Sequence, residues 1–194
     1  MNERPPFASA FAARPKDGEV ECGDAAYVRA LGPGRTLFAL FDALGHGPAA
    51  ARASAIALAT LEACDEAIDL PGLVDRLHAD LRGSRGAAAL IGIAEGHDVR
   101  ACLIGNVELR GSREAPVGVI HSPGVLGISI RKLHFFGGLV RPGSRLLAFS
   151  DGVSPKLDHA ALAGLGTQEA CDHALQHYGT PLDDASVLVL DALP

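Results

Sequence analysis

The chain has 194 residues, which is the size of one domain of about 100–200 residues and enough to bury a hydrophobic core. Hydrophobic residues make up 48% of it and charged residues 21%, which excludes a disordered chain. Lys and Arg number 17 against 23 Asp and Glu, so the net charge is −6, and the chain has no Trp. This acidic composition argues against a nucleic-acid partner, whose binding needs a basic surface and stacking side chains.

In chain order, residues 1–18 are predicted to be a flexible N-terminal leader, and strands are predicted over residues 19–31 and 35–41. The sequence Gly32-Pro33-Gly34 between them is a strong turn signal. The second strand reads Thr36-Leu-Phe-Ala-Leu-Phe41, an apolar run that is typical of a strand buried on both faces.

Two helices are predicted next. Pro48 suits the first position of a helix, and apolar residues at helical spacing continue to Ile68, opposite a charged face. A second helix is predicted over residues 70–82. The pattern then changes to short strands, one helix and a final strand: strands 87–94, 98–104, 117–121, 133–140 and 144–150, helix 167–178 and strand 186–190. This order indicates an α+β domain rather than alternating βαβ units.

The cysteines indicate the compartment. They lie far apart and form neither a zinc-binding spacing nor a disulfide framework: Cys22, Cys64, Cys102 and Cys171. We expect buried thiols in a reducing cytoplasm. The N-terminus lacks the apolar region of a secretory signal, and no segment approaches the ~18 apolar residues of a membrane span. A cytoplasmic protein with no membrane partner is therefore expected.

Aspartates stand at the ends of three apolar strands, namely Asp42, Asp151 and the pair Asp183 and Asp184, and Asp24 lies within the first predicted strand. These are the candidate functional residues. Each of them taken alone is also typical of an ordinary turn. Together, converging carboxylates without arginines repel one another unless a cation lies among them. Hard oxygen ligands favour Mg²⁺ or Mn²⁺ over zinc, and two such ions would activate a phosphoryl group and a water molecule.

Four motifs carry a family resemblance. Phe41-Asp-Ala-Leu-Gly-His-Gly47 resembles the D-G-[LM]-G-H-G signature of the SpoIIE-like branch of the metal-dependent protein serine/threonine phosphatases, the PPM superfamily. The other three resemble that branch's G-D, S-D-G and D-D-x-[ST] elements: Gly23-Asp24, Phe149-Ser-Asp-Gly152 and Asp183-Asp-Ala-Ser186. All four occur in family order over roughly residues 19–191. The mid-chain sequence Ile104-Gly-Asn-Val-Glu108 and the short length are similar to the stressosome phosphatases within this branch.

The resemblance implies a fold and a site. The fold would be an αββα four-layer sandwich of two antiparallel sheets flanked by helices, forming a single phosphatase domain over residues 19–194. By motif position, Asp42 and Asp151 would be catalytic. Two Mn²⁺ or Mg²⁺ ions would be held by the following residues: Asp24, Asp42, the carbonyl of Ala43, Asp151 and Asp183. Residues outside this set would support it or face the phosphate: Gly45, His46, Gly47 and Asp184.

The resemblance also implies a reaction and a partner. Metal-activated hydroxide would hydrolyse phosphoserine or phosphothreonine in line, without a phosphoenzyme. The substrate would be a phosphorylated STAS-domain protein of the stressosome.

One position departs from the family pattern, because Ala43 replaces the glycine that follows the first aspartate. If the backbone there needs a positive φ, alanine costs on the order of 1 kcal/mol. The alternative function is therefore a catalytically impaired binding module of the same fold that regulates a signalling partner. A metal-dependent phosphatase of small molecules is a third possibility. His46, between two glycines, is read as part of a turn rather than as a catalytic acid or base.

Overall fold

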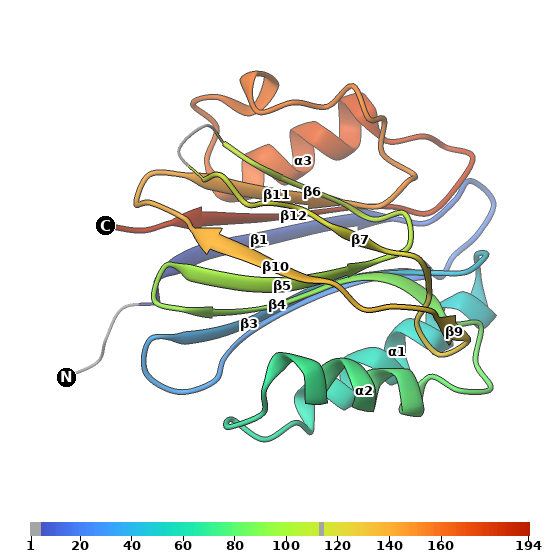
Figure 1. Ribbon diagram of the computed structural model, residues 1–194. Coiled ribbons are helices and arrows are strands. Elements are labelled where there is room, and N and C mark those ends of the chain that lie inside the picture. The colour runs from blue at the N-terminus through green and yellow to red at the C-terminus, as the bar shows by residue number, and fades with distance from the viewer. Residues whose placement is uncertain (1–4, 113–114) are drawn as a thin grey trace.

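The computed structural model describes residues 5–112 and 115–194 as two β-sheets packed face to face between helices (Figure 1). Helices α1 (Pro48–Glu62) and α2 (Leu70–Asp80) cover the outer face of one sheet, and α3 (Thr167–Tyr178) covers that of the other. The layers are thus helix, sheet, sheet and helix, which confirms the expected α+β sandwich. Among the described residues, no helix has the length and apolar character needed to cross a membrane.

The sheet next to α1 and α2 has the strand order β10-β5-β4-β3-β2, and the short β7 pairs with β5 in parallel. Its strands are β2 (Asp24–Ala30), β3 (Arg35–Ala43), β4 (Ala87–Glu95), β5 (Asp98–Ile104), β7 (His121–Ser122) and β10 (Phe135–Leu139). The long strands pair in antiparallel fashion, with β3 between β2 and β4. Residues 36–41 of β3 are all buried, as their apolar run predicts.

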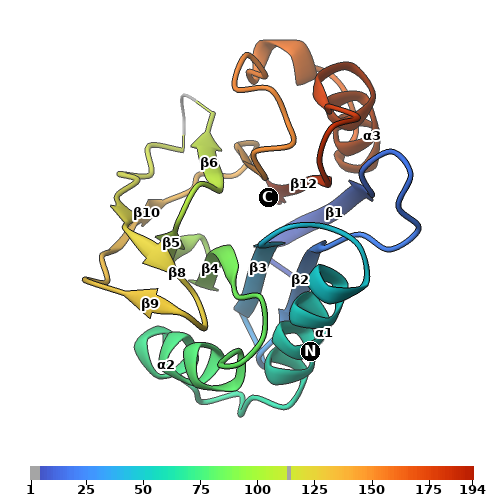
Figure 2. The same ribbon diagram turned by 90° about the vertical axis from the view of Figure 1, so that its right-hand side faces the viewer.

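The other sheet has the order β1-β12-β11-β6 and is antiparallel throughout. Its strands are β1 (Phe7–Arg14), β6 (Glu108–Gly111), β11 (Arg145–Phe149) and β12 (Ala185–Ala192). Figure 2, which turns the molecule by 90°, shows β1 beside β12, with α3 next to them.

The flexible leader expected over residues 1–18 is wrong for the segment that forms β1. This strand pairs with β12 along its whole length, from Phe7 opposite Ala192 to Arg14 opposite Ala185. Phe7 packs into the layer between the sheets, whereas Ala10 faces α3. Small alanines hide this alternation in the sequence, and the pairing with β12 creates the strand. Residues 1–4 lie outside the described residues.

Other predicted boundaries shift for local reasons. The first helix ends at Glu62 instead of continuing to Ile68, because Asp65 accepts a hydrogen bond from the amide of Ala67 in a turn. The strand predicted over residues 117–121 reduces to β7, since the amides of Val117 and Val119 each bond to the carbonyl two residues before. The helix predicted over residues 167–178 is confirmed.

Three apolar layers hold the elements together. One lies between α1, α2 and their sheet, one between the two sheets, and one between the second sheet and α3. On β3, Leu37, Ala39 and Phe41 face the helices, while Phe38 and Leu40 face the other sheet. Because side chains alternate along a strand, the next residue on the inter-sheet face is Asp42.

Candidate metal centre

The aspartates of the four motifs meet at one end of the two sheets. β2 begins where β3 ends, so Asp24 and Asp42 are register partners. On the other sheet β11 ends where β12 begins, with Phe149 opposite Val187. Asp151 follows the end of β11 and Asp183 precedes β12. The loops leading to β2 and β12 lie side by side at the right of Figure 1.

The alternation of side chains continues the inter-sheet core into a polar end. Asp24 is on the same face of β2 as Ala26, which packs between the sheets. Ser150 and Ser186 continue the inward-facing positions of β11 and β12, and both are fully buried. The amide of Ser186 donates to the Ser150 hydroxyl at 3.0 Å. The apolar layer therefore ends in carboxyl and hydroxyl groups at this edge.

Asp42 is the electrostatic centre of the group. Burial, and then the charges of Asp24, Asp151 and Asp183, raise its pKa from 3.8 to about 8. A backbone hydrogen bond from Asp151 acts in the opposite direction. The charges of three other motif carboxylates therefore act on Asp42. A raised pKa from like charges is the mark of carboxylates that share one site.

Asp24 is the most buried of these groups, with 5% of its surface exposed. Burial raises its pKa to about 7, and the Ser150 and Ser186 hydroxyls lower it in part. Neither hydroxyl reaches hydrogen-bonding geometry, and neither carboxylate oxygen of Asp24 has a hydrogen-bond partner in the described part of the chain. A buried carboxylate without a donor is costly unless it is protonated or binds a cation.

Asp151 lies at the outer side of the group and is exposed. Burial of its carboxyl and the charge of Asp183 raise its pKa, whereas Asp42 and Asn106 lower it. The Asn106 side-chain amide donates a hydrogen bond to Asp151 Oδ2 from the turn before β6. This contact fixes the orientation of the Asp151 carboxylate.

The two neighbouring aspartates before β12 have different contacts. Asp184 is buried and accepts hydrogen bonds from the amides of Lys16 at 2.8 Å and Gly23 at 2.7 Å. Asp183 is partly exposed and accepts only from the amide of Asp184, at 2.9 Å, in its own turn. The carboxylate of Asp184 thus joins the loop before β2 to the start of β12, whereas that of Asp183 keeps acceptor capacity for a ligand.

Two motif glycines are required by close approach. A Cβ on Gly23 would lie 2.6 Å from the Cβ of Ala50 on α1 and 2.9 Å from Asp184 Oδ2. A Cβ on Gly152 would lie 1.9 Å from the carbonyl oxygen of Asp184. Backbones pack directly on one another at both positions, which explains why glycine accompanies Asp24 and Asp151.

Ala43 fits its position without strain. It is the last residue of β3 and pairs with Ala87, and every residue with a positive φ in the described ranges 5–112 and 115–194 is a glycine. Its methyl group is buried in the layer under α1. The cost expected for a positive φ at this position therefore does not arise, and the observation that favoured an impaired module is removed.

His46 lies in the loop after β3, and both of its ring nitrogens contact other side chains, so neither is free to act as a catalytic acid or base. Its Nδ1 lies 2.7 Å from Glu19 Oε1, and its Nε2 lies 3.0 Å from the Lys16 ammonium. Since an ammonium only donates, Nε2 accepts and Nδ1–H donates to Glu19. Gly45 and Gly47 have φ of 83° and 69°, which turn the chain into α1. His46 thus ties this loop to the loop before β2.

The donor set fits a divalent cation on chemical grounds. No three His, Cys, Asp or Glu side chains in the described segments are grouped closely enough to hold an ion as they stand. However, Asp24 presents two buried oxygens without donors, and burial together with the charges of nearby aspartates raises the pKa of Asp42. Oxygen donors of this kind suit Mg²⁺ or Mn²⁺, and a cation would relieve the repulsion.

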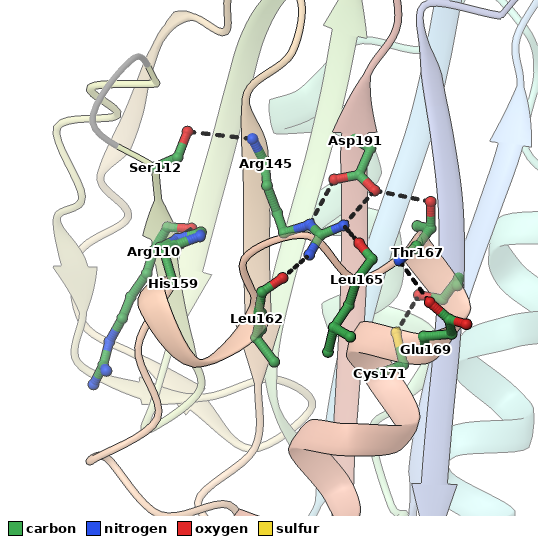
Figure 3. A network of polar contacts seen from close by, with 12 residues as sticks. Arg110, Ser112, Arg145, His159, Leu162, Leu165, Thr167, Glu169, Cys171 and Asp191 are labelled. Carbon is green, nitrogen blue, oxygen red and sulfur yellow. Dashed lines mark hydrogen bonds and ion pairs between the residues drawn. The ribbon is translucent and has the colours of Figure 1, made fainter.

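A cavity of about 410 Å³ lies at the opposite end of the second sheet, near the start of β11. Its main polar group is Arg145, drawn in Figure 3, which bonds to Asp191 through Nε at 2.6 Å and Nη2 at 2.8 Å. The same guanidinium also donates to the carbonyls of Leu162 and Leu165, at 3.0 Å each. Because these donors are already used, we assign Arg145 a structural role: it connects β11 to Asp191 on β12 and to the segment around Leu162 and Leu165.

Three supporting residues were not identified as such from the sequence, although each lies in a motif quoted above: Asn106, Ser150 and Ser186. Asn106 could have been found from its place at the end of β5, since that end adjoins the carboxylates. The two serines could have been found from strand alternation, given the partners of β11 and β12. Both signals require the strand register, which the sequence does not contain.

Solved structures resemble this chain over nearly its whole length, although no protein-family model and no curated protein sequence matches it. A chain from "The bacterial stressosome: a modular system that has been adapted to control secondary messenger signaling" is 30% identical, with 95% of this chain and 98% of that chain covered and a TM-score of 0.87. RsbX in complex with magnesium is 23% identical, with 97% and 96% covered and a TM-score of 0.80. A chain with the PP2C phosphatase domain and a fragment of the regulatory domain of SpoIIE from Bacillus subtilis is 18% identical, with 96% of this chain and 62% of that chain covered and a TM-score of 0.71.

The paired sheets and the aspartates at their common end define a phosphatase fold of the PP2C type. The chain belongs to the PPM superfamily of protein serine/threonine phosphatases. Among the solved structures with this fold is RsbX.

Proposed function

We propose that this protein is a metal-dependent phosphatase that hydrolyses phosphoserine or phosphothreonine in a protein substrate. The observation that carries the proposal is the convergence of four aspartates from four motifs at one end of the sandwich, where burial and then the charges of the other three raise the pKa of Asp42 to about 8. A cluster of buried carboxylates lowers the stability of the fold, but it is chemically suited to a reaction that needs cations.

The residues that would hold Mg²⁺ or Mn²⁺ are Asp24, Asp42, Asp151, Asp183 and the backbone carbonyl of Ala43. Cations bound there would supply the Lewis acid that hydrolysis of a phosphate ester requires. The chain's own contribution is orientation: Asn106 holds the Asp151 carboxylate, and Asp184 holds the loop that leads to Asp24. Buried Ser150 and Ser186 limit water behind Asp24.

A phosphorylated STAS-domain protein of the stressosome is the proposed substrate. The 30% identity to a chain from the bacterial stressosome work and the likeness to RsbX support this assignment. The four cysteines are free thiols, which fits a reducing cytoplasm.

The test is the release of phosphate from a purified phosphorylated STAS-domain protein, with Mn²⁺ and with EDTA. We expect release only with the cation, and a loss of at least about 100-fold in Asp42→Asn and Asp151→Asn. Asp75→Asn is the matched control, because Asp75 is an exposed carboxylate on α2 away from the motifs. Wild-type rates in both site variants would overturn the proposal.

The substrate class is tested separately. The rate on a phosphopeptide is compared with the rates on nucleotides at equal concentration. A preference for nucleotides would replace the protein phosphatase by a phosphatase of small molecules.

A further inference from the structure

An arginine-lined groove lies beside the carboxylate site, between α1 and the turn that follows α2. It has a volume of about 470 Å³ and is lined by Ala49, Arg52, Ile56, Arg82, Gly83, Ser84 and Arg85. Figure 2 shows α1 next to the segment that leads from α2 to β4. The groove is thus formed by residues of α1 and residues of the turn after α2, and α2 separates these two segments in the sequence.

The three arginines of the groove have no anionic partner among residues 5–112 and 115–194. The ion pairs in the described residues involve other groups, and no acidic side chain lines the groove. By contrast, Arg29, Arg35 and Arg145 all donate hydrogen bonds to backbone carbonyls. The chain carries a net charge of −6, so three unpaired guanidinium groups in one groove form a local positive region on an acidic protein.

The groove is continuous with the loop that follows Asp42. The position of a Cβ on Gly45 would be 3.3 Å from Arg85 Nη1, so this guanidinium lies against the loop. The amide of Leu44 also donates to the carbonyl of Gly86 at 3.0 Å, which joins the two segments. α1 begins at the same place with no acidic residue in its first turn and no side-chain cap. A chain lying in the groove would therefore reach the carboxylates.

The size and composition of the groove indicate its ligand. A single phosphate is satisfied by one or two guanidinium groups, whereas 470 Å³ and three arginines can accommodate several residues. Ile56, which is 38% exposed, adds an apolar surface one helical turn from Arg52. Acidic side chains with an adjacent apolar residue complement this surface.

We infer that the groove binds an acidic segment of the phosphoprotein substrate next to the phosphorylated residue. This inference rests on the proposed function and deepens it, because it assigns substrate selection to Arg52, Arg82 and Arg85. The carboxylates would hold the cations needed at the phosphoryl group, while the arginines hold the flanking chain. Binding would weaken as salt is added, since exposed charges are screened within about 10 Å at 0.1 M.

The test measures binding by fluorescence anisotropy with two labelled phosphopeptides that differ only in their flanking residues, Glu and Asp in one and Gln and Asn in the other. We expect the wild type to prefer the acidic peptide by about tenfold or more. In Arg52→Gln/Arg82→Gln/Arg85→Gln this preference should disappear. Arg141→Gln is the control for loss of an exposed arginine outside the groove, because Arg141 is exposed in the turn before β11; it removes one positive charge, whereas the triple variant removes three.

Equal affinity for the two peptides in the wild type, or an unchanged preference in the triple variant, would overturn the inference. Phosphate release from p-nitrophenyl phosphate by the wild type is measured in parallel, because this small substrate tests catalysis without a flanking chain. If that release fails while the acidic preference depends on the arginines, the phosphatase proposal is wrong and the groove still binds acidic peptides.

Discussion

Asp24 on β2 lies directly opposite Asp42 on β3, so two carboxyl groups are paired across adjacent antiparallel strands at the end of the inter-sheet core. Like charges at paired positions destabilise a sheet. Here the pairing is accompanied by burial, and the pKa rises to about 7 for Asp24 and about 8 for Asp42. Without a cation, the paired carboxylates lower the stability of the fold, and a bound cation would restore it. The first prediction concerns this stability in the metal-free protein.

The metal-free protein should become less stable as the pH rises from 5 to 9. Folded Asp24 and Asp42 keep protons up to about pH 7 and 8, whereas the unfolded chain loses them near 3.8. The folded state binds more protons in this window, so the free energy of unfolding falls as pH rises through it. Thermal melting in EDTA measures the effect, and adding Mn²⁺ at pH 8 should raise the melting temperature.

The matched variant for this prediction is Asp42→Asn, which removes one titrating group. Its melting temperature in EDTA should fall less with pH and exceed that of the wild type at pH 8. Burial also lowers the pKa of His159, but that residue is unchanged in both proteins and cancels in the comparison. Identical pH profiles for the two proteins would contradict the electrostatic description of the site.

Ala43→Gly should reduce stability and should not tighten Mn²⁺ binding. The substitution removes a buried methyl group and adds backbone freedom at the end of β3, for a loss of about 1–2 kcal/mol. Since Ala43 has no positive φ, glycine relieves no strain. Chemical denaturation measures the first effect and calorimetry the second. Tighter Mn²⁺ binding in the variant would show that the alanine impairs the site.

Asp184→Ala should destabilise the protein more than Asp183→Ala. Asp184 accepts two hydrogen bonds from distant backbone amides, and their loss should cost about 2–4 kcal/mol. Asp183 accepts one local bond, so its replacement should cost about 1 kcal/mol or less while it weakens Mn²⁺ binding. Urea denaturation of the metal-free variants separates the two, and equal losses would be inconsistent with the contacts described.

Arg145→Met should destabilise the fold by about 2–4 kcal/mol, because it leaves Asp191 with Thr167 as its remaining side-chain donor (Figure 3). The side chain of Arg145 is 15% exposed, so solvent replaces few of its contacts. Arg141→Met, in an exposed turn, is the control and should change stability by less than about 0.5 kcal/mol. Equal stability of the two variants would mean that the hydrogen bonds of Arg145 do not stabilise the fold.

The elements predicted correctly from the sequence are those with a strong local pattern. Residues 36–41 read as a buried strand, and residues 167–178 read as a helix, because apolar side chains recur at the required spacing. β1 and β6 are edge strands without such a pattern, and they form because β12 and β11 offer free edges. These two strands form through pairing with strands that are distant in the sequence, and the local sequence of each does not reveal that pairing.

The candidate site was predictable in part for the same reason. Aspartates at the ends of apolar strands pointed to a shared edge, and the four motifs gave their order. The hydrogen bond from Asn106 and the inward positions of Ser150 and Ser186 depend on strand register. The arginine-lined groove depends on how α1 packs beside the turn after α2, which residue spacing does not reveal.

The most direct test of the metal centre is isothermal titration calorimetry of MnCl₂ into the metal-free wild type, Asp42→Asn and the Asp75→Asn control at pH 7.5. Asp42→Asn removes the carboxylate on which the charges of Asp24, Asp151 and Asp183 all act. We predict saturable binding to the wild type and the control, and affinity weaker by about tenfold or more in Asp42→Asn. Absence of binding to the wild type, or equal affinity in all three proteins, would contradict the assignment of these aspartates to a cation site.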